Sequence, residues 1–423
     1  MNTKTPRSSE AEGRLTRRKQ AKREALFAEA AQQLNDRGAG SVVLSEIGAA
    51  VGLSRNALYY YVADRTDLVF QSYVRSCELT ASDLEAAARQ GAAIPAITAF
   101  VEATMAFDRP PAAVLCDVDA LDDERRAEIH ALQARNTDAL RALFRLGVEE
   151  GVFRPHDDEV AAQSLAGMMS WILLTPGWTN RPDLPEGRAI AVRTICSMVF
   201  DGMAADGQTL SPRPIDINAL LSRPFDAFDR RQSGEIKMQQ LAAAASRLFN
   251  RKGIDGVSLD EVGLEVGATK SVIYHYFKDK TDLVAYCYRR SLDLHETIQT
   301  TCHGLPDASA ADRIATLIDL SCQAQIGPLS PLMMQAGFLN LPEADRTETA
   351  ARITGFRKIW VGLCESGVAA GDCRNMDAVY SGVAATGLFS WLPKWRRADH
   401  RLSPTALSTE LVSLVMLGLR RRE

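Results

Sequence analysis

The sequence lacks the features that mark membrane-spanning and secreted proteins. None of its apolar runs is long enough to cross a bilayer, and residues 1–25 have no apolar core of the signal-peptide kind. Eight cysteines are scattered without a CxxC pair or a Cys/His cluster, which is typical of a reduced cytosolic protein. We interpret the adjacent Cys302 and His303 as neighbours at a helix end, not as metal ligands. We therefore expect a cytoplasmic protein with no metal site and no membrane association.

Signatures of common enzyme classes are missing as well. No nucleophile elbow, Walker loop, HExxH zinc motif or dinucleotide fingerprint occurs in the 423 residues. The period-two alternation that marks half-buried strands is also absent. These absences predict an all-α chain that is not an enzyme and needs no cofactor.

The most informative stretch runs from residue 258 to residue 283. Ser258 and Glu261 form a capping-box pattern at the start of a short amphipathic segment. Gly267 suits the left-handed C-cap that ends such a helix, and Thr269 is placed to begin a second one. Two short helices about a glycine turn predict a helix-turn-helix.

The same stretch occurs earlier in the chain, 215 residues upstream. Further matches continue downstream of it with an offset of 220, which indicates a five-residue insertion in the second copy. We interpret the chain as a tandem duplication. The first block matches Leu44, Glu46, Val51, Gly52, Tyr59, Tyr61, Asp64, Thr66, Asp67 and Leu68 to Leu259, Glu261, Val266, Gly267, Tyr274, Tyr276, Asp279, Thr281, Asp282 and Leu283, and the second matches Leu121, Arg126, Gly147, Val148, Gly151, Arg154, Asp157, Gly167, Ser170 and Trp171 to Leu341, Arg346, Gly367, Val368, Gly371, Arg374, Asp377, Gly387, Ser390 and Trp391.

Helical periodicity and breaker residues divide the chain into two similar units. We expect a disordered basic arm at 1–18, a helix-turn-helix domain at 19–65, a helical C-terminal-type domain at 66–204, a linker at 205–233, a second helix-turn-helix domain at 234–280 and a second helical domain at 281–423. The arm and its junction with the first helix carry Arg7, Arg14, Arg17, Arg18 and Lys19, and either a solvated tail or a DNA-touching arm fits this composition.

Charge is distributed unevenly between these domains. The whole chain has a net charge of −4, but residues 1–75 carry +4 and residues 223–290 carry +3. The remaining residues therefore carry −11. This localises any phosphate-facing surface to the two helix-turn-helix segments.

The two helix-turn-helix segments resemble those of the TetR/AcrR regulator family. The resemblance rests on Leu-Tyr-Tyr-Tyr-Val at 58–62, Ile-Tyr-His-Tyr-Phe at 273–277 and Asp-Lys-Thr-Asp-Leu at 279–283. It implies an all-helical C-terminal domain that dimerises and holds an inducer pocket. The first copy departs from the second at Val43, where the second has the cap Ser258, and a missing cap costs roughly 1 kcal/mol. Copy one is therefore expected to be the looser reader.

The resemblance also implies which residues contact DNA. Residues at the start of a recognition helix reach base edges, whereas neighbouring cations and tyrosines grip phosphates. The base-reading residues would be Ser54, Arg55, Asn56, Tyr59 and Tyr60 in copy one and Thr269, Lys270, Ser271, Tyr274 and His275 in copy two. The phosphate contacts would be Tyr61, Arg65, Tyr276 and Lys280.

Methionine and aromatic side chains in the C-terminal domains are candidates for an inducer pocket, and the alternative is that they pack in the core, which is the commoner role of such side chains at helical spacing. The run from Trp391 to Arg397 is similar to that in family members that respond to acyl-CoA thioesters. Its Lys394, Arg396 and Arg397 would either meet a ligand's phosphates or form a solvated basic face. The candidate pocket residues are Met168, Trp171, Met334, Phe338, Trp391 and Trp395.

These observations predict a DNA-binding transcriptional regulator, a repressor released by a small apolar or acyl-CoA-like ligand. The alternative is an architectural DNA-binding protein without a ligand, and an enzyme on the same scaffold is a third reading. Because one chain holds two units, we expect an intramolecular pseudo-dimer, with helices at 157–174 and 186–203 packing on helices at 376–392 and 404–420. Its unlike heads would bind an operator with two unlike half-sites. A homodimer of whole chains on palindromic sites is the alternative.

Overall fold

The computed structural model describes residues 6–178, 183–221, 230–397 and 399–422. Among these residues there are helices and two isolated β-bridges, Phe153 with Arg420 and Ala204 with Cys373, but no strand. The all-α prediction is confirmed for this part of the chain. None of the described helices is long and apolar enough to cross a membrane.

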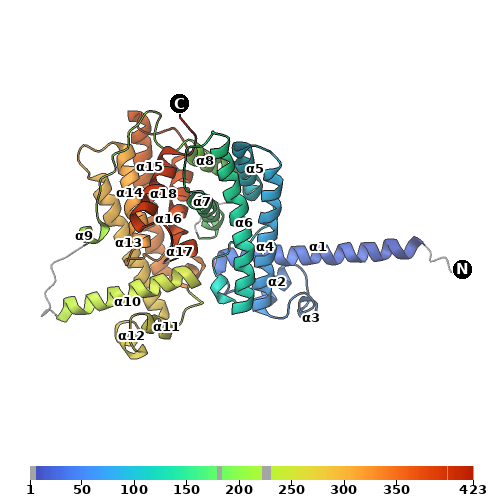
Figure 1. The fold of residues 1–423 in the computed structure, drawn as a ribbon. Helices are drawn as coiled ribbons and strands as arrows, with labels where there is room; N and C mark the ends of the chain where they lie inside the picture. Colours follow the sequence, from blue (N-terminus) through green and yellow to red (C-terminus); the bar gives the residue numbers. More distant parts are fainter. Residues whose placement is uncertain (1–5, 179–182, 222–229, 398, 423) are drawn as a thin grey trace.

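Each unit begins with a small three-helix head, which is followed by a bundle of longer helices (Figure 1). Unit one contains α1 (Pro6–Arg37), α2 (Leu44–Ala50), α3 (Arg55–Leu58), α4 (Arg65–Ala88), α5 (Ala93–Met105), η1 (Val118–Ala120), α6 (Asp123–Glu149), α7 (Asp158–Trp178) and α8 (Pro185–Phe200). After α9 (Ile217–Leu221), unit two contains α10 (Arg230–Lys252), α11 (Leu259–Glu265), α12 (Lys270–Tyr276), α13 (Lys280–His303), α14 (Ala310–Ile326), η2 (Ala336–Asn340), α15 (Glu343–Ala370), α16 (Ala378–Ser390), α17 (Leu392–Trp395) and α18 (Pro404–Leu417).

The two units share interior polar contacts as well as helix order. In unit one, the Asn35 side chain donates to the carbonyl of Ala112 and accepts from the amide of Val114. In unit two, Asn250 makes the equivalent pair of bonds to Pro331 and Met333. Each asparagine braces the segment that joins the fifth and sixth helices of its unit to the head. This repeated contact lies outside the sequence matches that indicate the duplication.

Two expectations about chain organisation are wrong. Residues 6–18, expected to be a disordered arm, form the first turns of α1, and residues 1–5 lie outside the described part. Helix α7 continues through Pro176 to Trp178, beyond its predicted end at residue 174. The segment predicted as the linker packs against α14 over part of its length, because the amide of Ser211 donates to Asp312 and the amide of Arg213 donates to Thr316. Residues 222–229 of the linker lie outside the described residues.

The buried apolar side chains of the described residues form one large core and two small ones. The large core runs without a break through the C-terminal domains of both units, because α7 and α8 pack against α16 and α18. Each head has a separate core of its own, around Phe27 in unit one and Phe249 in unit two. The two units therefore fold around a shared interior, and the four expected helices meet there.

Two glycines from equivalent positions allow α7 and α16 to cross closely. A Cβ atom on Gly387 would lie 2.5 Å from the carbonyl oxygen of Gly167, and one on Gly167 would lie 2.8 Å from the carbonyl oxygen of Gly387. The Cβ atoms of Trp171 and Trp391 pack against the opposite glycine, each 2.7 Å from the point where a Cβ on that glycine would lie. The Gly and Trp matches in the duplicated sequence therefore mark the local two-fold axis between the units.

The chain also exchanges backbone hydrogen bonds between the units at their far end. The amide of Arg154 donates to the carbonyl of Leu419 at 2.8 Å, and the amide of Arg374 donates to the carbonyl of Met203 at 2.8 Å. Gly202 and Gly418 cross beside these bonds with positive φ angles of +75° and +68°. The repeated arginines thus serve the contact between units, which is symmetrical in its backbone pairing.

We predict that Gly387→Ala destabilises the protein by about 1–3 kcal/mol, because the added methyl group would collide with backbone that has no room to move. Urea unfolding followed by circular dichroism measures the change. Gly355→Ala on α15 is the matched control, since its new methyl group would meet nothing within 4 Å. Equal unfolding midpoints for the two variants would contradict the close crossing of α7 and α16.

Candidate DNA-reading heads and a ligand cavity

The head of unit two has the local structure predicted for it. The amide of Glu261 donates to Ser258 Oγ at 3.2 Å, and the amide of Ser258 donates to Glu261 Oε2 at 2.7 Å, which completes a capping box. Lys252 binds the other carboxylate oxygen of Glu261 at 2.8 Å, and this bond together with the Ser258 amide lowers the pKa of Glu261. Gly267 follows α11 with a φ of +66° and turns the chain into α12.

The outer face of α12 carries the residues predicted to read DNA. Thr269 occupies the N-cap position, although its side chain makes no cap hydrogen bond. Lys270 lies within 3.2 Å of Asp260, an exposed pair that a phosphate or base edge would displace at little cost. Tyr274 is 50% exposed, which a core residue of this size would not be. The exposed set consists of Thr269, Lys270, Ser271, Tyr274 and His275.

The head of unit one presents the equivalent face on a shorter helix. Val43 makes no side-chain cap bond to α2, as its sequence suggested. Helix α3 spans only four residues, and the amide of Ala57 donates to Ser54 Oγ at 3.3 Å to cap it. Tyr59 and Tyr60 are 47% and 70% exposed, and the remaining predicted base readers Ser54, Arg55 and Asn56 are exposed too.

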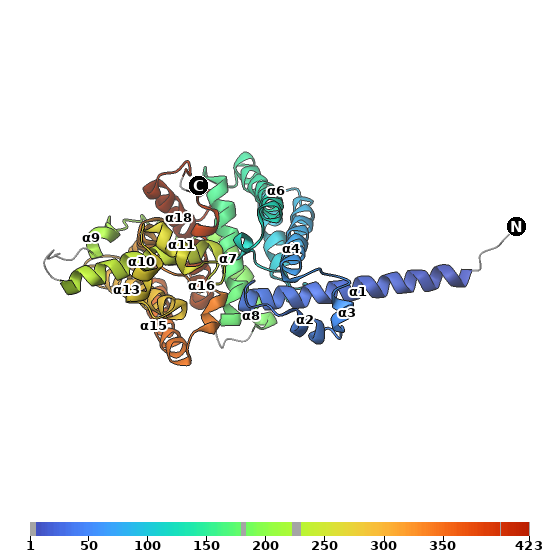
Figure 2. The same ribbon diagram turned by 90° about the horizontal axis from the view of Figure 1, so that it is seen from below.

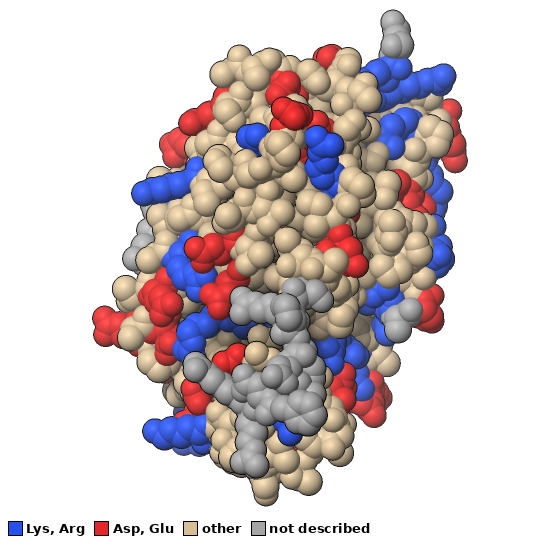
Figure 3. All heavy atoms as spheres, turned by 90° about the vertical axis from the view of Figure 1, so that its left-hand side faces the viewer, with Lys and Arg blue, Asp and Glu red and all other residues tan. Residues whose placement is uncertain are grey.

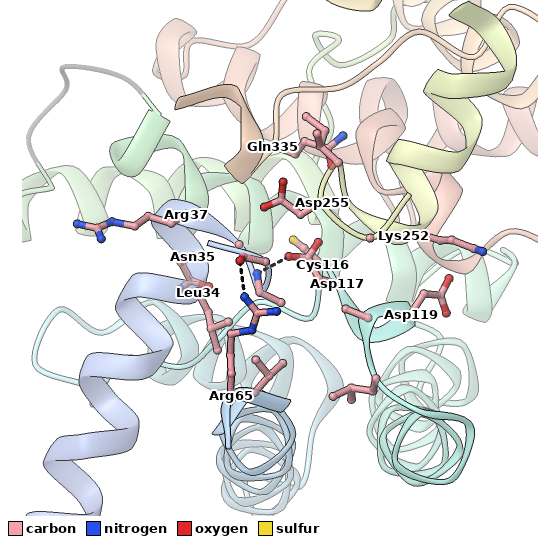
Figure 4. A pocket seen from close by; sticks show the side chains of 18 of the residues that line it. Leu34, Asn35, Arg37, Arg65, Cys116, Asp117, Asp119, Lys252, Asp255 and Gln335 are labelled. Atoms are coloured by element: carbon pink, nitrogen blue, oxygen red, sulfur yellow. Dashed lines mark hydrogen bonds between the residues drawn. The ribbon is translucent and has the colours of Figure 1, made fainter. Parts of the chain in front are cut away.

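Two of the residues predicted to grip phosphates are directed elsewhere. Arg65 Nη1 donates to the carbonyl of Gly40 at 2.8 Å, so its guanidinium lies between the heads (Figure 4). Lys280 is half-buried, and burial lowers its pKa although Asp255 and Glu261 lie near it. Both residues lie in the first turn of a long helix, α4 or α13. Their side chains would have to rotate toward solvent to make the expected phosphate contact. Tyr61 and Tyr276 are half-buried against the head cores.

The heads meet each other where α1 and α10 end. Ser41 Oγ donates to the carboxylate of Asp255 at 3.0 Å, and Asn340 donates to Ser41 Oγ at 3.2 Å. The amide of Ala39 donates to Asp117 at 2.8 Å, and burial, together with the negative charge of Asp255, raises the pKa of Asp117. Around these contacts lies a cavity of about 300 Å³ with both polar and apolar lining, the inter-head cavity, to which both units contribute (Figure 4).

Lys394 holds this junction together from the C-terminal side. Its ammonium donates to the carbonyl of Cys116 in unit one and, at 3.4 Å, to the carbonyl of Arg251 at the end of α10. Lys394 therefore follows neither of the two alternatives given for it, a ligand's phosphates or a solvated basic face, because its ammonium is bound to carbonyl groups of both units. The basic run that follows α16 is in part a structural tether.

A second cavity, of about 230 Å³, lies inside the C-terminal domain of unit two and is called the unit-two cavity below. Helices α13, α14, α15 and α16 supply most of its wall, which is mainly apolar. Trp171 and Thr175 close one side, and both belong to α7 of unit one. A ligand in this cavity would thus touch both units at once.

A few polar groups interrupt the apolar wall of the unit-two cavity. His295 stands between the rings of Phe356 and Phe389, and burial lowers the pKa of His295 to about 4. One turn further along α13, Gln299 donates to the carbonyl of Phe356 at 3.3 Å, while its buried Oε1 accepts no hydrogen bond from the described residues. Arg357 is exposed and lines the same cavity. His295 and Gln299 were not among the predicted pocket residues, although their i, i+4 spacing on a long amphipathic helix places both on one face.

Only two of the six predicted pocket residues, Trp171 and Met334, line this cavity. Met168 is fully buried in the shared core, and Trp391 packs at the glycine crossing. Phe338 contacts Tyr288 in the core of the second head, and Trp395 packs against His400. These four side chains pack against other residues outside the unit-two cavity.

The matching region of unit one is built differently. Asp83, at the position of Ile298, forms a largely buried ion pair with Arg109 at 2.6 Å. Asn136, at the position of Phe356, donates to the carbonyl of Cys77 at 2.9 Å. Polar cross-links therefore replace two apolar cavity-lining residues of unit two.

Comparison with known families agrees with this organisation. The family described as "Bacterial regulatory proteins, tetR family" matches residues 241–287, the head of unit two and the start of α13. The domain described as "Tetracyclin repressor-like, C-terminal domain" matches residues 95–174 and 307–419, one stretch in each unit. The chain belongs to the TetR family of bacterial transcriptional regulators. This membership confirms the expectation that it is not an enzyme.

Individual relatives cover only parts of the chain. An HTH-type transcriptional regulator of Staphylococcus aureus strain USA300 is 31% identical over 67 residues, which are 16% of this chain. The chain spans only 36% of the length of that relative. A TetR/AcrR-family regulator from Thermobifida fusca is 26% identical with a TM-score of 0.33, covering 44% of this chain and 100% of its own. The regulator PfmR from Thermus thermophilus is 20% identical with a TM-score of 0.36, covering 43% of this chain and 99% of its own.

We predict that acid destabilises the protein partly through His295. Its pKa is lower in the folded state than in the unfolded chain, so the unfolded chain binds more protons between about pH 6.5 and pH 4. Stability is therefore lost as pH falls through that window, by at most about 3 kcal/mol from this residue. Urea unfolding across the window measures the loss, which His295→Leu should reduce. His303→Gln, a change at an exposed position, is the control. An unaltered pH profile in His295→Leu would show that the ring is solvated.

Proposed function

We propose that this chain is a transcriptional regulator that binds operator DNA with both heads and responds to a ligand in the unit-two cavity. One observation carries the proposal: both α3 and α12 lie at the same edge of the molecule, with exposed polar and aromatic side chains (Figure 1). A recognition helix enters the major groove, and two heads joined by a fixed body read two half-sites on one side of a duplex. The described fold thus has the arrangement that a dimeric regulator needs, within one chain.

The heads differ, so the preferred operator has two unlike half-sites. Unit two reads with Lys270, Ser271 and His275, whereas unit one reads with Arg55, Asn56 and Tyr60 at the matching positions. Asparagine forms a bidentate contact to adenine, whereas serine contacts any of the bases. Arginine and lysine both bind guanine, but lysine lacks the planar two-donor fork of arginine. The symmetry of a site mirrors the symmetry of the protein that binds it.

The unit-two cavity supports a ligand-responsive regulator over the architectural alternative. Its apolar wall and the free acceptor of Gln299 suit a small apolar molecule that carries a hydrogen-bond donor. Arg357 suits an anionic end of the same molecule. A volume of about 230 Å³ accommodates a small acyl group, so an acyl-CoA ligand would leave its nucleotide outside.

The wall supplied by α7 gives this ligand a route to the heads. A ligand shifts an equilibrium only if it binds one state better than the other. Trp171 and Thr175 reach the cavity from unit one, so a change in the α7–α16 crossing alters the cavity and the separation of the heads together. A ligand that fits one crossing geometry would therefore favour one head spacing. If that spacing does not match the operator, ligand binding releases the DNA, and the regulator acts as a repressor.

We predict that Lys270→Ala with Tyr274→Ala abolishes sequence-specific binding without changing helicity, because both side chains are exposed on α12. Base contacts contribute about 1–3 kcal/mol each. Fluorescence anisotropy on a duplex selected from a random pool at fixed salt measures the affinity, and light scattering should find one chain per duplex. Arg55→Ala with Tyr59→Ala is the matched change in unit one. It should weaken the base preference only in the half-site that unit one reads. Unchanged sequence preference in both double variants would refute the proposed reading faces.

We predict that Val383→Trp abolishes the ligand response and leaves DNA binding intact, because the indole would fill the cavity that Val383 lines. Acyl-CoA thioesters and apolar carboxylic acids are the compounds to test by thermal shift, since a ligand at one hundred times its dissociation constant stabilises by about 2.7 kcal/mol. Gln163→Trp, at the matching position in unit one, is the control and should keep the response. A ligand that still stabilises Val383→Trp would place the site elsewhere.

A further inference from the structure

The first helix of unit one carries a basic segment that unit two lacks. Residues 7–23 contain seven Lys or Arg and two Asp or Glu, whereas the matching residues 222–238 contain four and three. Helix α1 begins at Pro6 and extends away from the rest of the molecule in two perpendicular views (Figures 1 and 2). The two heads therefore differ in the charge that they place beside a duplex.

Contacts of α1 with its own head fix the direction of the basic face. Lys22 Nζ donates to the carbonyl of Val51 at 2.7 Å, at the end of α2. Lys19 Nζ lies over the ring of Tyr60, 5.4 Å from its centroid. Lys19 and Lys22 are one turn apart on the same face of α1, so this face is directed toward the head and its exposed tyrosines.

Arg18 continues this face one turn outward. It lies four residues before Lys22, which places it above Lys22 on the helix surface. Arg18 and Lys19 are both exposed, and no acidic side chain pairs with either of them among the described residues. Their positive charges are available to a partner that approaches Tyr60.

The matching positions in unit two are neutral. Arg18 and Lys19 correspond to Ser233 and Gly234 at the start of α10. Figure 3 shows Lys and Arg intermixed with Asp and Glu over the unit-two end of the molecule. The unit-two head therefore has no counterpart of the Arg18–Lys19 pair.

We infer that Arg18 and Lys19 bind backbone phosphates that flank the half-site read by unit one. This inference rests on the proposed DNA binding and adds to it, because these contacts lie outside both recognition helices. Phosphate contacts position a protein and contribute affinity without reading sequence. The added affinity compensates for the short α3 and the uncapped α2 of unit one. It also makes the salt-dependent part of DNA binding larger at the unit-one half-site than at the other.

The test is the salt dependence of binding to a 40-base-pair duplex of random sequence, measured by fluorescence anisotropy between 50 and 200 mM salt. Each phosphate contact contributes about 0.9 to the slope of log affinity against log salt concentration. We predict that Arg18→Gln with Lys19→Gln reduces the slope by about 1.8. The reciprocal change, Ser233→Arg with Gly234→Lys, should raise it by a similar amount, and a Cβ on Gly234 would meet nothing within 4 Å.

Arg135→Gln with Lys358→Gln is the control, because it removes the same charge from exposed positions on α6 and α15. Its slope should equal that of the unaltered protein. Hydroxyl-radical footprinting on a selected operator should show that the Arg18/Lys19 variant loses protection at one end only. An unaltered protein without salt-dependent DNA binding would overturn the proposed function and the inference together. Normal binding with an unchanged slope in the Arg18/Lys19 variant would overturn the inference alone.

Discussion

The close crossing of α7 and α16 is the contact on which the rest of the structure depends. Two backbones approach within van der Waals distance only where neither carries a side chain, and Gly167 and Gly387 supply that condition at equivalent positions. The crossing aligns the duplicated units about a local two-fold axis, lets their C-terminal domains share one core, and brings Trp171 to the wall of the unit-two cavity. A change in this one contact would therefore reach both the cavity and the heads.

The heads are also tied to each other directly. Ser41 binds Asp255, and Lys394 joins Cys116 to Arg251, so the ends of α1 and α10 are held at one spacing by polar bonds. Polar bonds of this kind contribute about 1 kcal/mol each and exchange readily with water. The spacing is thus well defined but not rigidly locked, which suits the ligand response proposed above.

Duplication within one chain has allowed the two units to diverge. A homodimer is restricted to identical heads and identical pockets. Here the units carry different residues on the outer faces of α3 and α12. In unit one, the Asp83–Arg109 ion pair occupies the region that matches the unit-two cavity. Charge has diverged too, since only unit one has the Arg18–Lys19 pair at its first helix. The common framework, including Asn35 and Asn250, has stayed the same because it holds each head to its own domain.

The sequence alone determined the features that depend on neighbours along the chain. Capping residues, glycine turns and helical periodicity predicted the all-α fold, the capping box at Ser258 and the outward face of α12, because these are set within one or two helical turns. The internal repeat predicted which helices would pair between the units. Only the tertiary structure decided where side chains far apart in sequence would meet. Trp391 and Met168 have the composition of pocket residues, yet they fill the crossing and the core, while His295 and Gln299 line the cavity. The sequence makes Lys394 and Arg65 candidates for phosphate contacts, but both side chains donate to backbone carbonyl groups. Only the fold decides whether such a cation is free or bound, because the fold brings the carbonyl groups beside it.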